Sequence, residues 1–193
     1  NYGTDQIVQM KAPEKPVISP DGTFIAFALG EASKEGAYPV SDIWLFDTEK
    51  GVSQQLTDGP SRDANPSWSP CGRYLTFESD RITRGTSQIY VIDVETGEMT
   101  RLSFQEGSAT APLWSPDGTM ISCLIPQVET PEERAEKEEI GDQWVVDENP
   151  KRTNIWVLHL PDKLETLLDG STRPGMRKIS PDDVHVGSMM HAL

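Results

Sequence analysis

The sequence predicts an all-β chain that forms part of a β-propeller, with about three four-stranded antiparallel blades and the start of a fourth. Three observations predict this fold. A four-residue phrase recurs along the chain, a short strand-like run follows each copy, and a second strand-like run follows three of the copies. The serines that begin the phrase are separated by 50, 46 and 65 residues. Four short strands at roughly this period are typical of a propeller blade.

The recurring phrase has the composition of a tight turn. It reads SPDG twice, SPCG once and SPDD once, and a large apolar residue precedes every copy. Proline presets φ for a type I turn, aspartate bonds to nearby backbone, and glycine adopts the left-handed conformation that leads into the next strand. No base, orienting partner or oxyanion site recurs beside it, so we interpret the phrase as a structural turn. The copies begin at Ser19, Ser69, Ser115 and Ser180, after Ile18, Trp68, Trp114 and Ile179.

The strand-like runs agree in phase from unit to unit. After the phrase come Phe24–Phe27, Tyr74–Phe77, Met120–Cys123 and, more weakly, His185–Ser188, whose third residues are small (Ala26, Thr76, Ser122 and Gly187). The second runs are Asp42–Asp47, Gln88–Asp93 and Asn154–His159, rich in β-branched and aromatic residues. A turn and then a leucine follow each, and we expect Leu56, Leu102 and Leu168 to lie in a final short strand. The repeating Trp44, Trp68, Trp114 and Trp156 are interpreted as core or inter-blade packing.

These signals predict a single partial propeller domain over residues 1–193. The predicted boundaries are about 14–58 for the first blade, 64–104 for the second, 110–169 for the third and 175–193 for the start of a fourth. Three blades and a hairpin fall short of the four to eight that close a propeller. We therefore expect open blade edges, which are templates for pairing with other strands.

The third unit contains an insertion over residues 126–153. Within it, Thr130 is a suitable N-cap, Pro131 suits the first helical position and Glu133 completes a capping box, while Gly141 is a plausible stop. The sequence therefore predicts one short acidic helix in the third blade. It is either a solvated decoration or a rim element that lines an entrance or contacts another domain.

The composition describes a globular chain that is strongly acidic. The formal net charge of −14 argues against nucleic acid and anionic membranes as partners. Two cysteines make neither a disulfide framework nor a metal cluster, and no apolar run approaches the length of a membrane helix. We expect no metal or cofactor, and a cytoplasmic location, with the periplasm or secretion as open alternatives.

Four segments together resemble the propeller of the prolyl oligopeptidase family, and within it the acylaminoacyl-peptidase-like branch. They are Asp5–Phe27, Gln55–Arg81 with the run GPSRDANPSWSP, Ser87–Ser103, and Val145–Leu160 with the run DENPKR. The phrase SPDG is shared with TolB-like propellers, which are the second choice. Members of the peptidase family carry a propeller that caps an α/β-hydrolase domain and restricts which peptides reach the catalytic serine.

The resemblance implies a peptidase parent, whereas this chain lacks the catalytic features. No serine lies in a G-x-S-x-G elbow, and no hydrolase domain is present. The expected partners are therefore the remainder of the propeller with an α/β-hydrolase domain, or other copies of the chain, and a peptide substrate in the intact parent. The alternative function is a TolB-like protein-interaction propeller with no link to a peptidase.

Five residues are candidates for contacts at the rim or along the path of a substrate. Asp80 and Arg81 are either substrate contacts at the mouth of the propeller or part of a local ion pair that fixes a loop. Trp144 is the tryptophan outside the repeat, within the insertion. Lys151 and Arg152 end the charged run at the close of the insertion.

Overall fold

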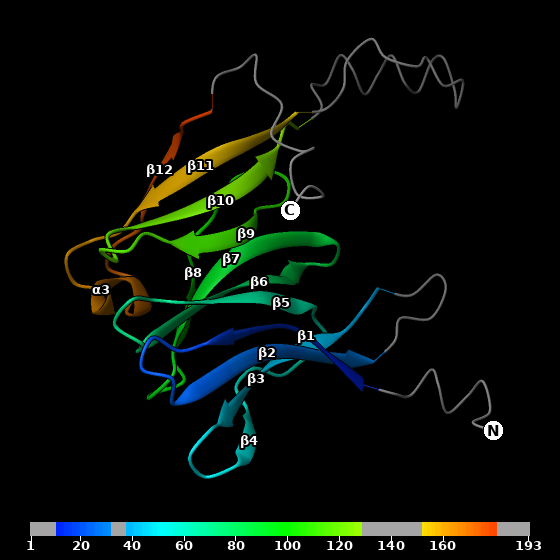
Figure 1. Ribbon diagram of the computed structural model, residues 1–193. Helices are drawn as coiled ribbons and strands as arrows, with labels where there is room; N and C mark the ends of the chain where they lie inside the picture. The colour runs from blue at the N-terminus through cyan, green and yellow to red at the C-terminus, as the bar shows by residue number, and fades with distance from the viewer. Residues whose placement is uncertain (1–10, 32–37, 129–151, 181–193) are drawn as a thin grey trace, which may run out of the picture.

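The computed structural model describes residues 11–31, 38–128 and 152–180, which form three four-stranded antiparallel sheets (Figure 1). The predicted all-β partial propeller is thereby confirmed. The first blade is β1 (Lys11–Ile18), β2 (Phe24–Glu31), β3 (Ser41–Asp47) and β4 (Val52–Gln55). The second blade is β5 (Asp63–Trp68), β6 (Tyr74–Thr83), β7 (Thr86–Asp93) and β8 (Met99–Arg101). The third blade is β9 (Thr110–Trp114), β10 (Met120–Pro126), β11 (Thr153–His159) and β12 (Gly175–Lys178).

The phrase SPDG forms the turn between the first two strands of a blade, as predicted. The Gly22 backbone N–H donates to the Ser19 carbonyl oxygen over 2.9 Å, and Gly22 has a φ of 78°. The Ser19 hydroxyl donates to Asp21 over 2.6 Å and accepts the Phe24 N–H over 2.9 Å. The copy at Ser115 repeats this arrangement, and its hydrogen bonds lower the pKa of Asp117 to about 2.

A left-handed residue interrupts the first strand of every blade directly before its proline. Lys15, Asn65 and Ala111 have φ values of 50°, 50° and 53°, and each lies where the pairing to the second strand shifts register. A β-bulge of this kind bends the strand and leaves one residue out of the ladder. The proline ring disfavours the right-handed helical region for the residue before it.

The hydrophobic core lies between the blades. One cluster fills the space between the first and second blades and includes Ala26, Ile43 and Phe77. Another fills the space between the second and third blades and includes Tyr74 and Ile121. The middle blade is therefore covered on both faces, and β6 is buried along seven consecutive residues.

The outer two blades are each buried on one face only. In β10 the buried residues Ile121, Cys123 and Ile125 alternate with partly exposed ones. On the first blade Ile18 is 66% exposed, whereas Trp68, at the same position of the second blade, is buried. Within the described part of the chain, the stack thus ends in two uncovered sheet faces.

The final strand of the third blade differs from the one that the sequence predicts. Leu168 was expected in that strand, but it ends the short helix α3 (Glu165–Leu168), and Leu167 points into the core instead. Glu165, Leu167 and Leu168 lose little side-chain freedom in a helix, which favours helix over strand in this segment. The place of the last strand is taken by β12, which pairs with β11, although the sequence predicts these residues as the start of a fourth blade.

Ser180 consequently has a different role from the other three serines of the phrase. The Ile179 N–H donates to the Ile155 carbonyl oxygen over 3.0 Å, and the Ser180 hydroxyl accepts the Ile155 N–H over 3.1 Å. At the ends of the first and second blades, the hydroxyls of Thr57 and Ser103 each accept the equivalent backbone N–H of the third strand. The prediction that SPDD begins a fourth blade is therefore wrong for Ser180, which marks the end of the third. Residues 181–193 and the predicted helix from Thr130 lie outside the described residues.

Candidate functional site

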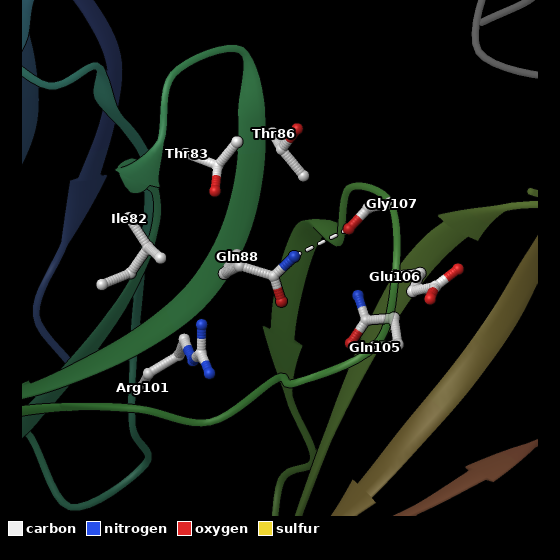
Figure 2. A pocket seen from close by; sticks show the side chains of 8 residues that line it. All are labelled: Ile82, Thr83, Thr86, Gln88, Arg101, Gln105, Glu106 and Gly107. Atoms are coloured by element: carbon white, nitrogen blue, oxygen red, sulfur yellow. Dashed lines mark hydrogen bonds between the residues drawn. The ribbon is translucent and has the colours of Figure 1, made fainter.

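A cleft lies between the ends of β6 and β7, strand β8 and the loop that follows it (Figure 2). Its volume is about 260 Å³. Ile82 and Gly107 line it together with six residues that carry polar side chains, namely Thr83, Thr86, Gln88, Arg101, Gln105 and Glu106. Sequence reasoning did not identify this cleft, because its walls come from three separate segments.

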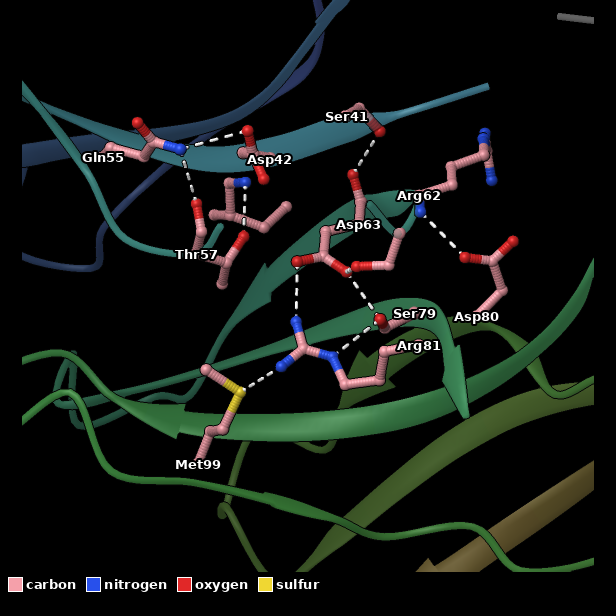
Figure 3. A network of polar contacts seen from close by, with 12 residues as sticks. Ser41, Asp42, Gln55, Thr57, Arg62, Asp63, Ser79, Asp80, Arg81 and Met99 are labelled. Carbon is pink, nitrogen blue, oxygen red and sulfur yellow. Dashed lines mark hydrogen bonds and ion pairs between the residues drawn. The ribbon is translucent and has the colours of Figure 1, made fainter. Parts of the chain in front are cut away.

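A polar cluster lies where the first and second blades meet (Figure 3). At its centre is Asp63 on β5, whose side chain is completely buried. Its carboxylate accepts the Ser79 hydroxyl over 2.5 Å and the Ser61 hydroxyl over 3.2 Å. The guanidinium of Arg81 completes the set with a hydrogen bond of 2.8 Å. A buried carboxylate with these donors is fully paired, which is the condition for keeping a charge inside a protein.

Arg81 is held on every side of its guanidinium. Besides Asp63 it donates to the Ser79 hydroxyl over 2.9 Å and contacts the Met99 sulfur over 2.6 Å. Its guanidinium carbon also lies 5.6 Å from the centre of the Phe77 ring and 5.0 Å from that of Tyr90. These contacts make Arg81 the link between the strands of the second blade.

Asp80 holds the hairpin between β6 and β7. Its carboxylate accepts the backbone N–H groups of Arg62 and Gly85 over 2.8 and 2.9 Å, and it forms an ion pair with Arg84. Arg84 in turn donates to the Pro39 carbonyl oxygen over 3.0 Å, so the hairpin is tied to the first blade. Asp80 and Arg81 are therefore adjacent in sequence but paired with different partners. Their contact with a substrate stays a prediction.

The carboxyl of Asp42, at the edge of the polar cluster, has fewer hydrogen-bond partners than that of Asp63. Its Oδ2 accepts the Gln55 amide over 3.0 Å, while its Oδ1 is buried without a partner among the described residues. Burial, and then the charges of Asp63 and Asp58, raise the pKa of Asp42. Two neighbouring acids of this kind do not make a metal centre, and the described residues contain no group of three or more ligand side chains.

The remaining predicted site residues lie at the insertion. Trp144 and Lys151 are outside the described residues. Arg152 immediately precedes β11, and its carbonyl oxygen accepts the Gln127 N–H over 2.8 Å, which closes the base of the insertion. In the described ranges no helix is long and apolar enough to cross a bilayer.

The first and second blades each receive a tryptophan from the following blade, at a site that we call the tryptophan acceptor site. It consists of the backbone carbonyl two residues before the SPDG serine and the small third residue of the second strand. The Trp114 indole N–H donates to the Ser67 carbonyl oxygen over 3.2 Å and to the Thr76 hydroxyl over 3.1 Å. Trp68 makes the matching bond to the Val17 carbonyl oxygen over 3.2 Å. The small residues that the sequence showed are thus small because an indole packs against them.

The same acceptor site exists on the third blade, on its uncovered face. The Ser122 hydroxyl donates to the Leu113 carbonyl oxygen over 3.4 Å, as the Thr76 hydroxyl does to Ser67 over 3.2 Å. The Leu113 side chain is 62% exposed. The third blade therefore repeats the carbonyl and hydroxyl of the acceptor site, with no indole bonded to them in the described residues.

Comparison with known proteins identifies relatives of two kinds. The family model described as the TolB beta propeller domain matches residues 5–140. The chain is 36% identical over 121 residues to the uncharacterized peptidase YuxL of Bacillus subtilis (strain 168), covering 63% of this chain and 18% of that protein. It is 37% identical over 76 residues to the Tol-Pal system protein TolB of Francisella tularensis subsp. mediasiatica (strain FSC147), covering 39% of this chain and 17% of that protein.

The fold is also similar to a solved peptidase structure. The uncomplexed acylaminoacyl peptidase of Pyrococcus horikoshii superposes with a TM-score of 0.61 at 14% identity, covering 92% of this chain and 26% of that one. At this identity the likeness concerns the fold alone. The chain spans less than a fifth of the length of the two curated relatives.

Proposed function

The chain belongs to the TolB beta propeller domain family, and from this premise we propose that its three blades are part of a larger propeller that caps and gates the active site of a serine peptidase. The substrates of that peptidase are peptides or acyl-peptides. The observation that carries the proposal is the 36% identity to a peptidase over 121 residues. Fold similarity to an acylaminoacyl peptidase supports it.

The uncovered faces of the stack support the presence of further blades. On the second blade this face is covered, since Thr76 is completely buried and bonds to the Trp114 indole. Ser122 and Leu113 repeat that geometry on the third blade without a covering indole in the described chain. Covering this face removes apolar surface from water, which is worth about 25 cal/mol per Å².

Gating requires a rim that a peptide meets before it reaches the active site. Strands β2, β6 and β10 end on the same side of the stack, each directly before the third strand of its blade (Figure 1). Asp80 and Arg81 fix the hairpin at this end, and Arg152 lies at the base of the insertion. We propose this end as the rim, with Trp144 and Lys151 of the insertion as further contacts.

The proposal is tested on the complete reading frame that contains this chain. The purified product should hydrolyse acyl-amino-acid or short peptide chromogenic substrates, and a serine-directed inhibitor should abolish turnover. The 193-residue chain alone should give no turnover, since it has no G-x-S-x-G elbow. A reading frame that encodes further blades and then stops, without such an elbow, would overturn the proposal.

A second candidate is a protein-interaction propeller of the TolB kind, with no peptidase link. The similarity to TolB over 76 residues and the family match favour it. The product of the same reading frame distinguishes the two functions. A serine-directed probe should label a peptidase and should not label an interaction propeller. The cytoplasmic location stays a prediction under either function.

A further inference from the structure

The distance along the chain from the end of a blade to the tryptophan of the next blade is constant. Each hydroxyl residue that caps the end of a blade is followed 11 residues later by that tryptophan, in the pairs Thr57 with Trp68 and Ser103 with Trp114. Ser180 caps the end of the third blade in the same way. The residue 11 positions after Ser180 is His191. His191 therefore has the position in the chain that a tryptophan has in the other two units.

The residues before His191 also have the positions of a first strand. In β5 and β9 the left-handed residue lies three positions before the tryptophan, at Asn65 and Ala111. Ser188 has this position before His191. The sequence predicts residues 185–188 as a second strand only because the SPDD phrase resembles the start of a blade. Since Ser180 ends the third blade instead, the spacing indicates that residues 186–191 are the first strand of a fourth.

The strand-to-strand contacts between neighbouring blades are made chiefly by the first strand of the later blade. Strand β5 contacts β1, β2 and β3 of the first blade, and β9 contacts β5, β6 and β7 of the second. The other strands of the later blade are not needed for these contacts. A single first strand is therefore enough to cover the face of the blade before it.

The third blade leaves an apolar side chain uncovered where such a strand would lie. Leu102, directly before the capping serine of the second blade, is 1% exposed and lies in the same core cluster as Ala109 of the next unit. Ile179 directly precedes the capping serine of the third blade, yet it is 52% exposed. Val186 corresponds to Ala109 when the two units are aligned on these serines. A strand over residues 186–191 brings an apolar side chain to Ile179 and removes its surface from water.

Histidine carries the hydrogen-bond donor that the tryptophan acceptor site requires. Its imidazole ring and the five-membered ring of indole join Cβ in the same way, and Nε2 of histidine is as many bonds from Cβ as Nε1 of indole. One ring nitrogen of a neutral histidine carries a proton and donates it. The Trp114 indole donates to the carbonyl oxygen of Ser67 and the hydroxyl of Thr76. Leu113 and Ser122 provide the same two groups on the third blade.

We propose that residues 186–191 lie across the third blade as the first strand of a fourth, and that Nε2–H of His191 donates to the Leu113 carbonyl oxygen and the Ser122 hydroxyl. The occupant of the uncovered face is thus a segment of this same chain. The inference rests on the larger propeller in the function proposed above, and not on its link to a peptidase. It therefore concerns a property of the 193-residue chain that needs no hydrolase activity.

NMR of the imidazole N–H groups tests this contact in the unaltered 193-residue chain. An imidazole proton gives a signal when burial and a hydrogen bond slow its exchange with water. We expect such a signal at Nε2 of His191 and none from His159, which is exposed. Ser122→Phe fills the acceptor site and should remove the signal. A folded chain in which His191 has no protected Nε2–H would overturn the proposal.

His191→Trp introduces the side chain that the first two acceptor sites hold. The indole adds a six-membered ring to the buried surface, so the melting temperature of the chain should rise by about 3–6 °C. His185→Trp is the matched control, because residue 185 precedes the proposed strand, and it should change the melting temperature by less than about 2 °C. An equal rise in both variants would show that a tryptophan stabilises this segment wherever it lies, and would contradict the proposal.

A second substitution shows whether residues 191 and 122 meet. In a chain that carries Ser122→Phe, His191→Trp should raise the melting temperature by less than about 1 °C, because the acceptor site is already filled. In a chain that carries Ser171→Phe, at an exposed position after α3, the full rise should remain. Neither measurement depends on turnover, so a failure of this inference is distinguishable from a failure of the peptidase function. A rise of the same size in both chains would place His191 away from Ser122 and overturn the proposal.

Discussion

The hydroxyl of Ser180 accepts the backbone N–H of Ile155 over 3.1 Å. Ser103 accepts the Ile89 N–H over 2.8 Å and Thr57 accepts the Ile43 N–H over 2.9 Å, so the three hydroxyl residues are equivalent. Each ends its blade by capping the third strand. This bond defines where a blade stops in this protein, just as the SPDG serine defines where its second strand begins.

Ser103→Ala should lower the stability of the chain. The substitution removes an acceptor for the buried Ile89 N–H and a donor to Gln88, and Ser103 is completely buried. We expect a loss of about 1–3 kcal/mol in the free energy of unfolding, measured by urea denaturation. Ser53→Ala on the exposed edge strand β4 is the control and should change it by less than about 0.5 kcal/mol. Similar losses for both variants would contradict the role of the capping bond.

Trp114→Phe tests the tryptophan acceptor site. Phenylalanine keeps an aromatic ring but leaves the Ser67 carbonyl without the indole N–H. The expected loss is about 1–2 kcal/mol in the free energy of unfolding. Trp156→Phe is the matched control, since Trp156 packs against the same inter-blade cluster and no indole hydrogen bond is described for it. If Trp156→Phe cost more than Trp114→Phe, packing alone would explain the repeated tryptophans.

Mutation of Arg73 should lower the stability of the chain much more than mutation of Glu165. Arg73 pairs over 2.7 Å with Asp93, whose side chain is 1% exposed, whereas its contact with Glu165 on α3 is solvent-exposed. Arg73→Gln removes the ion-pair partner of the buried Asp93 carboxylate, which keeps only the Glu95 and Thr96 N–H bonds among the described contacts, and should cost about 2–4 kcal/mol of stability. Glu165→Gln should cost less than about 1 kcal/mol. Thermal unfolding of the two variants side by side would show the difference, and equal costs would refute this ranking.

Glu78 should make the stability of the chain depend on pH. Burial raises the pKa of the Glu78 carboxyl above its ordinary value of 4.5, although the Ala111 N–H and the Asn65 amide both donate to it over 2.6 Å. The folded state therefore holds this proton more tightly than the unfolded state. The contribution of Glu78 to stability is present below pH 4.5 and is lost as the pH rises through the raised pKa.

Glu78→Gln isolates this contribution. Both donors bond to Oε1, so a carboxamide keeps them and removes the buried charge. The variant should be more stable than the parent chain at about pH 8, and the difference should shrink towards about pH 4, where the carboxyl is protonated. Urea denaturation at both pH values measures the effect. A stability difference between the variant and the parent chain that grew on acidification would contradict a raised pKa of Glu78.

The parts of the fold that the sequence predicted rest on local chemistry. The turns at Ser19 and Ser115 follow from proline, aspartate and glycine in one tetrapeptide, and the strands follow from β-branched and aromatic runs. Ser180 was assigned wrongly because its tetrapeptide resembles the others, whereas its role depends on pairing with Ile155, 25 residues earlier. No local pattern contains that information.

The candidate site was less predictable for the same reason. Asp80 and Arg81 stood out as adjacent charges, but their partners Arg84 and Asp63 become apparent only when the second blade is assembled. Gln105 carried no sequence signal at all, since an isolated glutamine in a loop is ordinary. The small residues Thr76 and Ser122 did carry a signal, whose meaning required the position of Trp114.

The gating role is tested most directly by Ser122→Phe in the complete protein. A phenylalanine there fills the tryptophan acceptor site of the third blade and should prevent a further blade from packing against it. The measured quantity is the ratio of the hydrolysis rates for a short acyl-peptide and for an unfolded protein. We predict that the parent protein cleaves only the short peptide and that Ser122→Phe also cleaves the unfolded protein. An unchanged ratio in a variant that is otherwise folded and active would contradict the proposal that these blades belong to a closed propeller that gates a peptidase.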